Sequence, residues 1–94
     1  MSPGEIRHDP VARRYELVFA TERASLDYEL DGTRQTFTHT WVPPALRGQG
    51  IAEKLVRAAL DDARRDGHKV IPECSYVATF MRRHPEYADL LSMA

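Results

Sequence analysis

Two glycines and an arginine between residues 47 and 52 form the segment best suited to bind an anion. The run Arg47-Gly48-Gln49-Gly50-Ile51-Ala52 follows a strand-like segment and opens an amphipathic helix. Backbone N–H groups at such a junction can point toward one place, where the helix dipole adds positive potential. Gly48 and Gly50 let a ligand come close to the backbone, and Arg47 adds a permanent charge. The loop is predicted to cradle a pyrophosphate; a tight turn that merely needs glycine is the alternative.

The same loop does not match two better-known phosphate motifs. It lacks the Lys-Ser/Thr pair of a P-loop. It also lacks the glycine spacing and the parallel strand unit of a dinucleotide fingerprint.

A second reactive group is the single cysteine, Cys74, which follows Pro72-Glu73 at the end of a predicted strand and precedes a predicted helix. A helix N-terminus favours the thiolate and so lowers the pKa of the thiol. Cys74 is therefore a candidate catalytic residue that takes up an acyl group or sits beside a thioester. The alternative is a small, inert, packed cysteine.

His39 lies in the middle of a predicted strand, two residues before Trp41. An imidazole with an ordinary pKa near 6.5 can accept a proton from an ammonium or a thiol at neutral pH. His39 is the first candidate for a general base, and a histidine satisfied within the sheet is the alternative. No cluster of His, Cys and Asp has metal-ligand spacing, so no metal is predicted.

Composition limits the classes of protein to which the chain can belong. Its 94 residues suffice for one small domain, and its net charge of −1 argues against a nucleic-acid binder. No apolar run reaches the roughly 20 residues that span a bilayer. The polar N-terminus lacks a signal core, and the lone cysteine suits a reducing compartment, so a cytoplasmic location is expected.

The elements that must position these residues follow from hydrophobic periodicity. Strands are predicted at 14–19, at 24–30 and at 33–42, with Asp31-Gly32 as a hairpin turn. On the third strand, Phe37, His39 and Trp41 are expected to share one face. A helix is predicted at 50–66, followed by a strand at 69–72 and a second helix at 76–83. The predicted architecture is thus a mixed α+β fold of three antiparallel strands, a helix, a strand and a helix.

Residues 1–12 show no periodicity and are expected to form a flexible arm, with residues 13–94 as the single domain.

Two motifs carry a resemblance to a known family. The run from Val42 to Ala52, in which Arg47, Gly50 and Ala52 fill the key positions, resembles the acetyl-CoA signature of the GNAT N-acetyltransferase superfamily. The downstream run Ile71-Pro72-Glu73-Cys74-Ser75-Tyr76-Val77 resembles that of a small single-domain branch of this superfamily. The resemblance covers about residues 14–91.

The resemblance implies a site and a cofactor. The third strand and the strand ending at Pro72 would splay apart and hold the pantetheine arm of CoA, and in the resembling branch Cys74 and His39 lie near the reaction centre. Tyr76 or Tyr87 could protonate the leaving CoA sulfur, although neither aligns securely with that role and core packing with a satisfied hydroxyl is the favoured explanation for each. The arginines at 82 and 83 could reach the adenosine phosphates or simply be solvated. The residues expected to bind the cofactor are Trp41, Val42, Leu46, Arg47, Gly48, Gln49, Gly50, Ile51, Ala52, Ser75, Arg82 and Arg83.

The function expected from the residues and the resemblance is an acetyl-CoA-dependent N-acetyltransferase. It would move an acetyl group to an amine acceptor, directly or through Cys74, as a monomer or a homodimer. One departure from the superfamily is the short link at 21–23, where full-length enzymes carry one or two helices that help form the acceptor site. A non-catalytic CoA-binding module therefore remains an alternative, and a small nucleotide-binding regulator is a weaker one.

Overall fold

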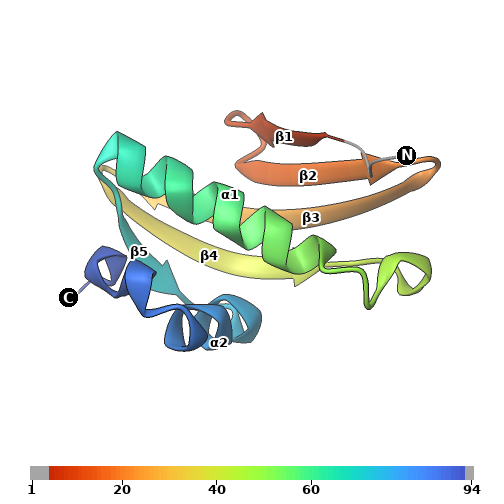
Figure 1. Ribbon diagram of the computed structural model, residues 1–94. Helices are drawn as coiled ribbons and strands as arrows, with labels where there is room; N and C mark the ends of the chain where they lie inside the picture. The colour runs from red at the N-terminus through yellow and green to blue at the C-terminus, as the bar shows by residue number, and fades with distance from the viewer. Residues whose placement is uncertain (1–4, 93–94) are drawn as a thin grey trace.

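Alternating apolar side chains build one buried face of a five-stranded sheet. The computed structural model describes residues 5–92. The strands follow one another across the sheet in chain order, with β5 parallel to β4 and all other neighbours antiparallel (Figure 1). A parallel step needs a crossover connection, and helix α1 supplies it. The predicted mixed α+β fold is confirmed, and the strands are β1 (Ile6–Asp9), β2 (Arg14–Phe19), β3 (Glu22–Asp31), β4 (Arg34–Trp41) and β5 (Lys69–Pro72).

Helix α1 (Ile51–Asp66) covers the buried face of the sheet (Figure 1). Its apolar side chains recur at helical spacing, so one stripe faces the sheet while charged residues face water. The helix ends where Gly67 takes a left-handed conformation with φ of 73°. The buried residues of the stripe are Ile51, Leu55, Val56, Ala59, Leu60 and Ala63.

Replacing Gly67 tests this helix end. The His68 N–H donates to the Ala63 carbonyl at 2.8 Å, a bond that requires the left-handed turn at Gly67. We expect Gly67→Ala to lower the free energy of unfolding by about 1 kcal/mol, because a Cβ disfavours this conformation. Urea denaturation measures the loss. Gly67→Asn is the matched control, since asparagine tolerates the turn; equal losses in both variants would contradict the explanation.

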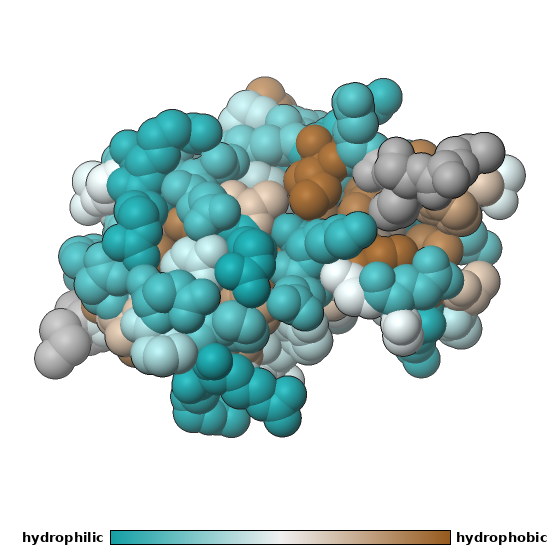
Figure 2. Space-filling view, viewed as in Figure 1, coloured by the Kyte–Doolittle hydropathy of each residue, from teal (hydrophilic) through white to brown (hydrophobic). Residues whose placement is uncertain are grey.

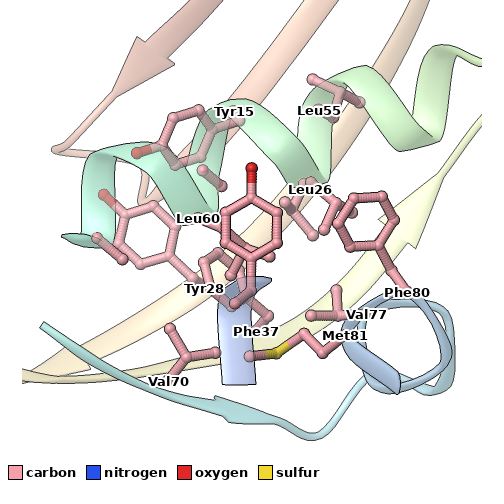
Figure 3. Close-up of a cluster of buried hydrophobic side chains, with 14 of the residues drawn as sticks. Tyr15, Leu26, Tyr28, Phe37, Leu55, Leu60, Val70, Val77, Phe80 and Met81 are labelled. Atoms are coloured by element: carbon pink, nitrogen blue, oxygen red, sulfur yellow. The ribbon is translucent and has the colours of Figure 1, made fainter. Parts of the chain in front are cut away.

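The second helix and two short 3-10 turns complete the core. Helix α2 (Ser75–Arg83) and the turn η2 (Pro85–Leu90) pack beside α1, whereas η1 (Pro44–Leu46) lies in the loop between β4 and α1. Figure 3 shows Val77, Phe80 and Met81 of α2 turned toward the same core as Phe37 and Leu60. The loop that precedes α1 is thereby held between the end of β4 and the start of the helix.

The predicted flexible arm is wrong for Ile6–Asp9, which form β1 and pair with β2. The cause is a specific contact rather than a periodic pattern. The His8 ring stacks on Tyr15 with ring centroids 4.2 Å apart, and His8 Nε2 also bonds with the hydroxyl of Tyr28 at 2.5 Å. Residues 1–4 of the predicted arm lie outside the described residues.

A β-bulge changes which residues of β4 face the core. Tyr28 of β3 pairs with Phe37, but the preceding residue Asp27 pairs with His39, which leaves one extra residue on β4. A bulge of this kind reverses the alternation beyond it. Leu26 is buried and pairs with Thr40, so Thr40 lies on the core face. The expectation that Phe37 and His39 share a face is therefore wrong: His39 lies on the opposite, outer face.

The outer face of the sheet carries polar side chains. Arg14 and Asp27 form an ion pair there at 2.8 Å, and Arg23 and Glu16 form another at 2.9 Å. Only two residues separate β2 from β3, and within residues 5–92 no helix covers this face. The same part of the chain contains no helix long and apolar enough to cross a membrane.

Candidate active site

A pocket of about 460 Å³ opens where β4 passes into the loop before α1. Strand β5 pairs with β4 only as far as Phe37, so the last four residues of β4 have a neighbour on one side only. The gap left by this early separation is the geometric basis of the pocket. Figure 2 shows hydrophobic atoms gathered toward the same end of an otherwise mostly hydrophilic face. The pocket is lined by Thr40, Trp41, Val42, Leu46, Arg47, Gly48, Gly50, Ile51, Ala52 and Tyr76.

The loop presents unused backbone donors to this pocket. Gly48 and Gly50 have φ of 83° and 74°, conformations that L-residues other than glycine rarely adopt. The first backbone bond of α1 runs from the Lys54 N–H to the Gly50 carbonyl at 3.1 Å. In the described structure, the N–H groups of residues 48–52 donate to no backbone acceptor. Together with the helix N-terminus they form a site suited to an anion.

Arg47 is held in place beside these donors. Its Nε donates to the Val42 carbonyl at 3.0 Å, and its guanidinium carbon lies 5.5 Å from the centre of the Trp41 ring. The cation–π contact and the hydrogen bond together hold the guanidinium group in one orientation. The two terminal nitrogens are left to meet an incoming anion.

Cys74 lies at the inner end of the gap between β4 and β5. Its backbone N–H donates to the Phe37 carbonyl at 2.8 Å, which extends the β4–β5 pairing by one step. Its Sγ lies 3.2 Å from Oγ1 of Thr40, a residue that lines the pocket. Cys74 is also the N-cap residue of α2, and its side chain is partly buried. The thiol thus stands next to the pocket wall, at the positive end of a helix.

The surroundings of Cys74 favour the thiolate. Partial burial raises the pKa of the thiol and is the largest single influence. Hydrogen bonds from the Thr40 hydroxyl and from the backbone N–H groups of Val77 and Tyr76 outweigh it, so the pKa lies below its ordinary value. The predicted position of Cys74 at a helix N-terminus accounts for the two backbone bonds but not for Thr40.

His39 does not line the pocket. It is exposed on the outer face of the sheet, one residue before Thr40, whose side chain points to the other face. Within residues 5–92 its imidazole makes no recorded hydrogen bond or ion pair. A second reactant that approached from the outer face would meet this free imidazole.

Four of the residues predicted to bind the cofactor are absent from the pocket lining. Gln49 lies in the loop, where its Nε2 donates to the Ala45 carbonyl at 3.4 Å. Ser75 is exposed at the first position of α2. Arg82 bonds to Thr79 at 3.2 Å on the exposed side of α2. Arg83 lies beside a separate hollow of about 90 Å³. The two arginines face away because the core stripe of α2 is formed by Val77, Phe80 and Met81.

Thr40 is the site residue that sequence reasoning missed. Its role depends on the bulge, which turns it toward Cys74, a residue 34 positions further along the chain.

Tyr76, considered as a proton donor, does line the pocket, and burial raises the pKa of its hydroxyl. Tyr87, the other candidate, instead donates to Asp61 at 2.8 Å and is buried at the far side of α1.

Comparison with known proteins identifies the family. Residues 14–90 match the family model described as GCN5-related N-acetyl-transferase. The chain therefore belongs to the GCN5-related N-acetyltransferase family.

Individual relatives agree with this assignment. Protein NATD1 of Gallus gallus is 36% identical over 86 residues, which cover 88% of this chain and 78% of the chicken protein. Protein NATD1 of Homo sapiens is also 36% identical over 86 residues, covering 88% of this chain and 76% of the human protein. A GCN5-like protein from Staphylococcus aureus, solved by NMR, superimposes with a TM-score of 0.77 at 26% identity, covering 98% of this chain and 91% of that one.

No metal centre is evident in this part of the chain. Within residues 5–92, no group of three or more His, Cys, Asp or Glu side chains is arranged to hold a metal ion.

Proposed function

We propose that the protein is an acetyl-CoA-dependent N-acetyltransferase in which Cys74 carries the acetyl group between acetyl-CoA and an amine. The observation that carries the proposal is a single pocket that joins the anion-binding loop before α1 to Thr40, the hydrogen-bond partner of Cys74. The free N–H groups of residues 48–52 and the guanidinium of Arg47 would hold the pyrophosphate of CoA. The open edge of β4 near Trp41 and Val42 offers backbone partners to the pantetheine arm.

In the first step the Cys74 thiolate attacks the carbonyl carbon of the acetyl thioester. The bond from that carbon to the CoA sulfur breaks, and CoA leaves as a thiolate that takes up a proton. The Tyr76 hydroxyl, which lines the pocket, is the proposed donor of that proton. The loop contributes chiefly by holding acetyl-CoA, the donor of the acetyl group, next to the sulfur of Cys74.

In the second step a neutral amine attacks the acetyl-Cys74 thioester. An amide bond forms, the Cys74 thiolate is released, and the attacking nitrogen loses a proton. We propose that the amine reaches the thioester from the outer face, through the gap between β4 and β5, and passes this proton to His39, whose imidazole is unpaired there.

Replacing His39 tests the second step alone. We expect His39→Ala to lower the rate of transfer to amines by about 10²-fold or more while acetylation of Cys74 continues at its normal rate. Single-turnover mass spectrometry separates the two steps. Thr36→Ala on the same strand is the control for general disturbance of the sheet. A parallel loss in both steps would remove His39 from the proposed role.

Binding is tested first by calorimetry with acetyl-CoA and with free CoA. Saturable binding of both at micromolar to low-millimolar concentrations is expected, and no binding of either would refute the proposal. An acetyl adduct of the intact protein is the second readout. Its absence with normal turnover would leave direct transfer from acetyl-CoA to the amine as the simpler mechanism.

A non-catalytic CoA-binding module is the second candidate function. The bare outer face favours it, since the two-residue connection between β2 and β3 leaves the acceptor side without covering helices. This candidate predicts tight CoA binding with no transfer to a broad panel of amines.

A further inference from the structure

A second cavity, of about 210 Å³, lies at the opposite end of α1 from the candidate active site. It is enclosed between the C-terminal half of the helix and strands β1 to β4, and it shares no lining residue with the first pocket. Figure 3 shows Tyr15 and Tyr28 between α1 and the sheet, in the region from which this cavity is built. The lining residues that decide its chemistry are Arg13, Tyr28, Gln35, Asp62, Asp66 and His68.

The acceptor groups of this cavity already have partners. Asp62 accepts from the Tyr15 hydroxyl at 2.8 Å and pairs with Arg65 at 2.9 Å. Asp66 pairs with the same arginine at 3.1 Å. The Tyr28 hydroxyl bonds with His8. Both carboxylates therefore already have partners, although they share one arginine, Arg65, and neither offers a free acceptor group to a ligand.

Two donor groups have no such partner. Gln35 is only 3% exposed; its Oε1 bonds with His68 Nδ1 at 3.2 Å, but its Nε2 has no recorded partner among residues 5–92. Because Gln35 lines the cavity and this N–H₂ group is still reached by solvent, a molecule that enters the cavity can accept a hydrogen bond from it. The Arg13 guanidinium likewise makes no recorded ion pair or hydrogen bond within the described chain.

The backbone fixes Arg13 at the wall of the cavity. Its φ is 56°, an unusual value for a residue other than glycine, and its carbonyl accepts from the Tyr28 N–H at 3.0 Å. The guanidinium is near enough to Tyr28 to lower the pKa of its hydroxyl, against the larger upward effect of burial. The unpaired groups of this cavity are therefore an exposed arginine, whose backbone is held by a hydrogen bond, and the N–H₂ group of a largely buried glutamine.

We propose that this cavity is a binding site for a small carboxylate. One carboxylate oxygen accepts from Gln35 Nε2, and the Arg13 guanidinium binds the same group through its forked donors. The cavity is smaller than the roughly 300–1,000 Å³ typical of drug-sized ligands, which restricts the ligand to a few non-hydrogen atoms. The site is independent of CoA binding at the other end of α1.

NMR titration of the full chain tests the proposal, with succinate as the probe and its neutral diamide as the isosteric control. We expect saturable shifts of the Gln35 side-chain amide with succinate and none with the diamide. Arg13→Gly should weaken succinate binding about tenfold or more. This variant should fold at least as well as the native chain, because glycine accepts the left-handed conformation.

Arg7→Gln is the matched control, because it removes one positive charge from exposed β1. It should leave succinate binding unchanged. Equal binding of succinate and its diamide, unchanged affinity in Arg13→Gly, or tighter binding of inorganic phosphate than of succinate would each overturn the proposal. CoA titrated into the same samples reports the first pocket separately, so failure at one site is distinguished from failure at the other.

Discussion

Cys74→Ala is expected to abolish the acetyl adduct that forms when the protein is incubated with acetyl-CoA. The reason is direct: the thiolate of Cys74 is the proposed nucleophile, and alanine offers no atom to which the acetyl group could be attached. Intact-protein mass spectrometry measures the result as the loss of a single added acetyl group. Calorimetry on the same variant should show CoA binding within a few-fold of normal, because the side chain of Cys74 does not line the pocket.

The pH dependence of the same reaction carries a further test. The thiolate is the reactive form, so the rate of adduct formation should rise with pH and level off above the pKa of Cys74. Because that pKa is lowered, the midpoint should fall below that of an ordinary cysteine. Thr40→Val removes the side-chain hydrogen bond to the sulfur and should move the midpoint upward by about one unit. Thr36→Val, on the same strand but before the bulge, is the matched control. An unmoved midpoint in Thr40→Val would mean that Thr40 only packs against the thiol.

Periodicity was sufficient to predict the elements that bury a continuous face. The strands around Tyr15 and Leu26 alternate strictly, and α1 repeats its apolar residues at helical spacing, so the burial of one side determines each element. The loop before α1 was predictable from its two glycines, and its role in binding an anion stays a prediction.

Features that depend on a partner distant in the chain could not be predicted in this way. Strand β1 is exposed along its whole length and is held at His8 by aromatic contacts that no period reveals. The bulge in β4 is defined only by its register against β3, and one extra residue moves His39 to the outer face and Thr40 to the inner one. The pairing of Thr40 with Cys74 follows from that shift. The prediction therefore identified the strand and the loop that line the pocket, but it placed His39 on the wrong face of that strand and did not include Thr40.

The charge at the start of α1 should decide whether CoA binds. Aspartate and asparagine have nearly the same shape, and both tolerate the left-handed conformation that Gly50 adopts with φ of 74°. A Cβ added at this position would meet no other atom within 4 Å, so either variant should fold. Gly50→Asp, however, adds a negative charge beside the N–H groups proposed to hold the pyrophosphate.

Relative to Gly50→Asn, the aspartate variant should bind CoA roughly ten- to a hundredfold more weakly. One unit charge about 6 Å from another contributes on the order of 1.5–3 kcal/mol near a protein surface. The difference between the two variants should shrink in 1 M salt, where the Debye length is about 3 Å. Calorimetry at low and high salt measures both effects, and thermal unfolding checks that the two variants are equally stable. If the two variants bound CoA equally at low salt, the pyrophosphate would have to lie away from this helix terminus, and the free N–H groups of residues 48–52 would need another explanation.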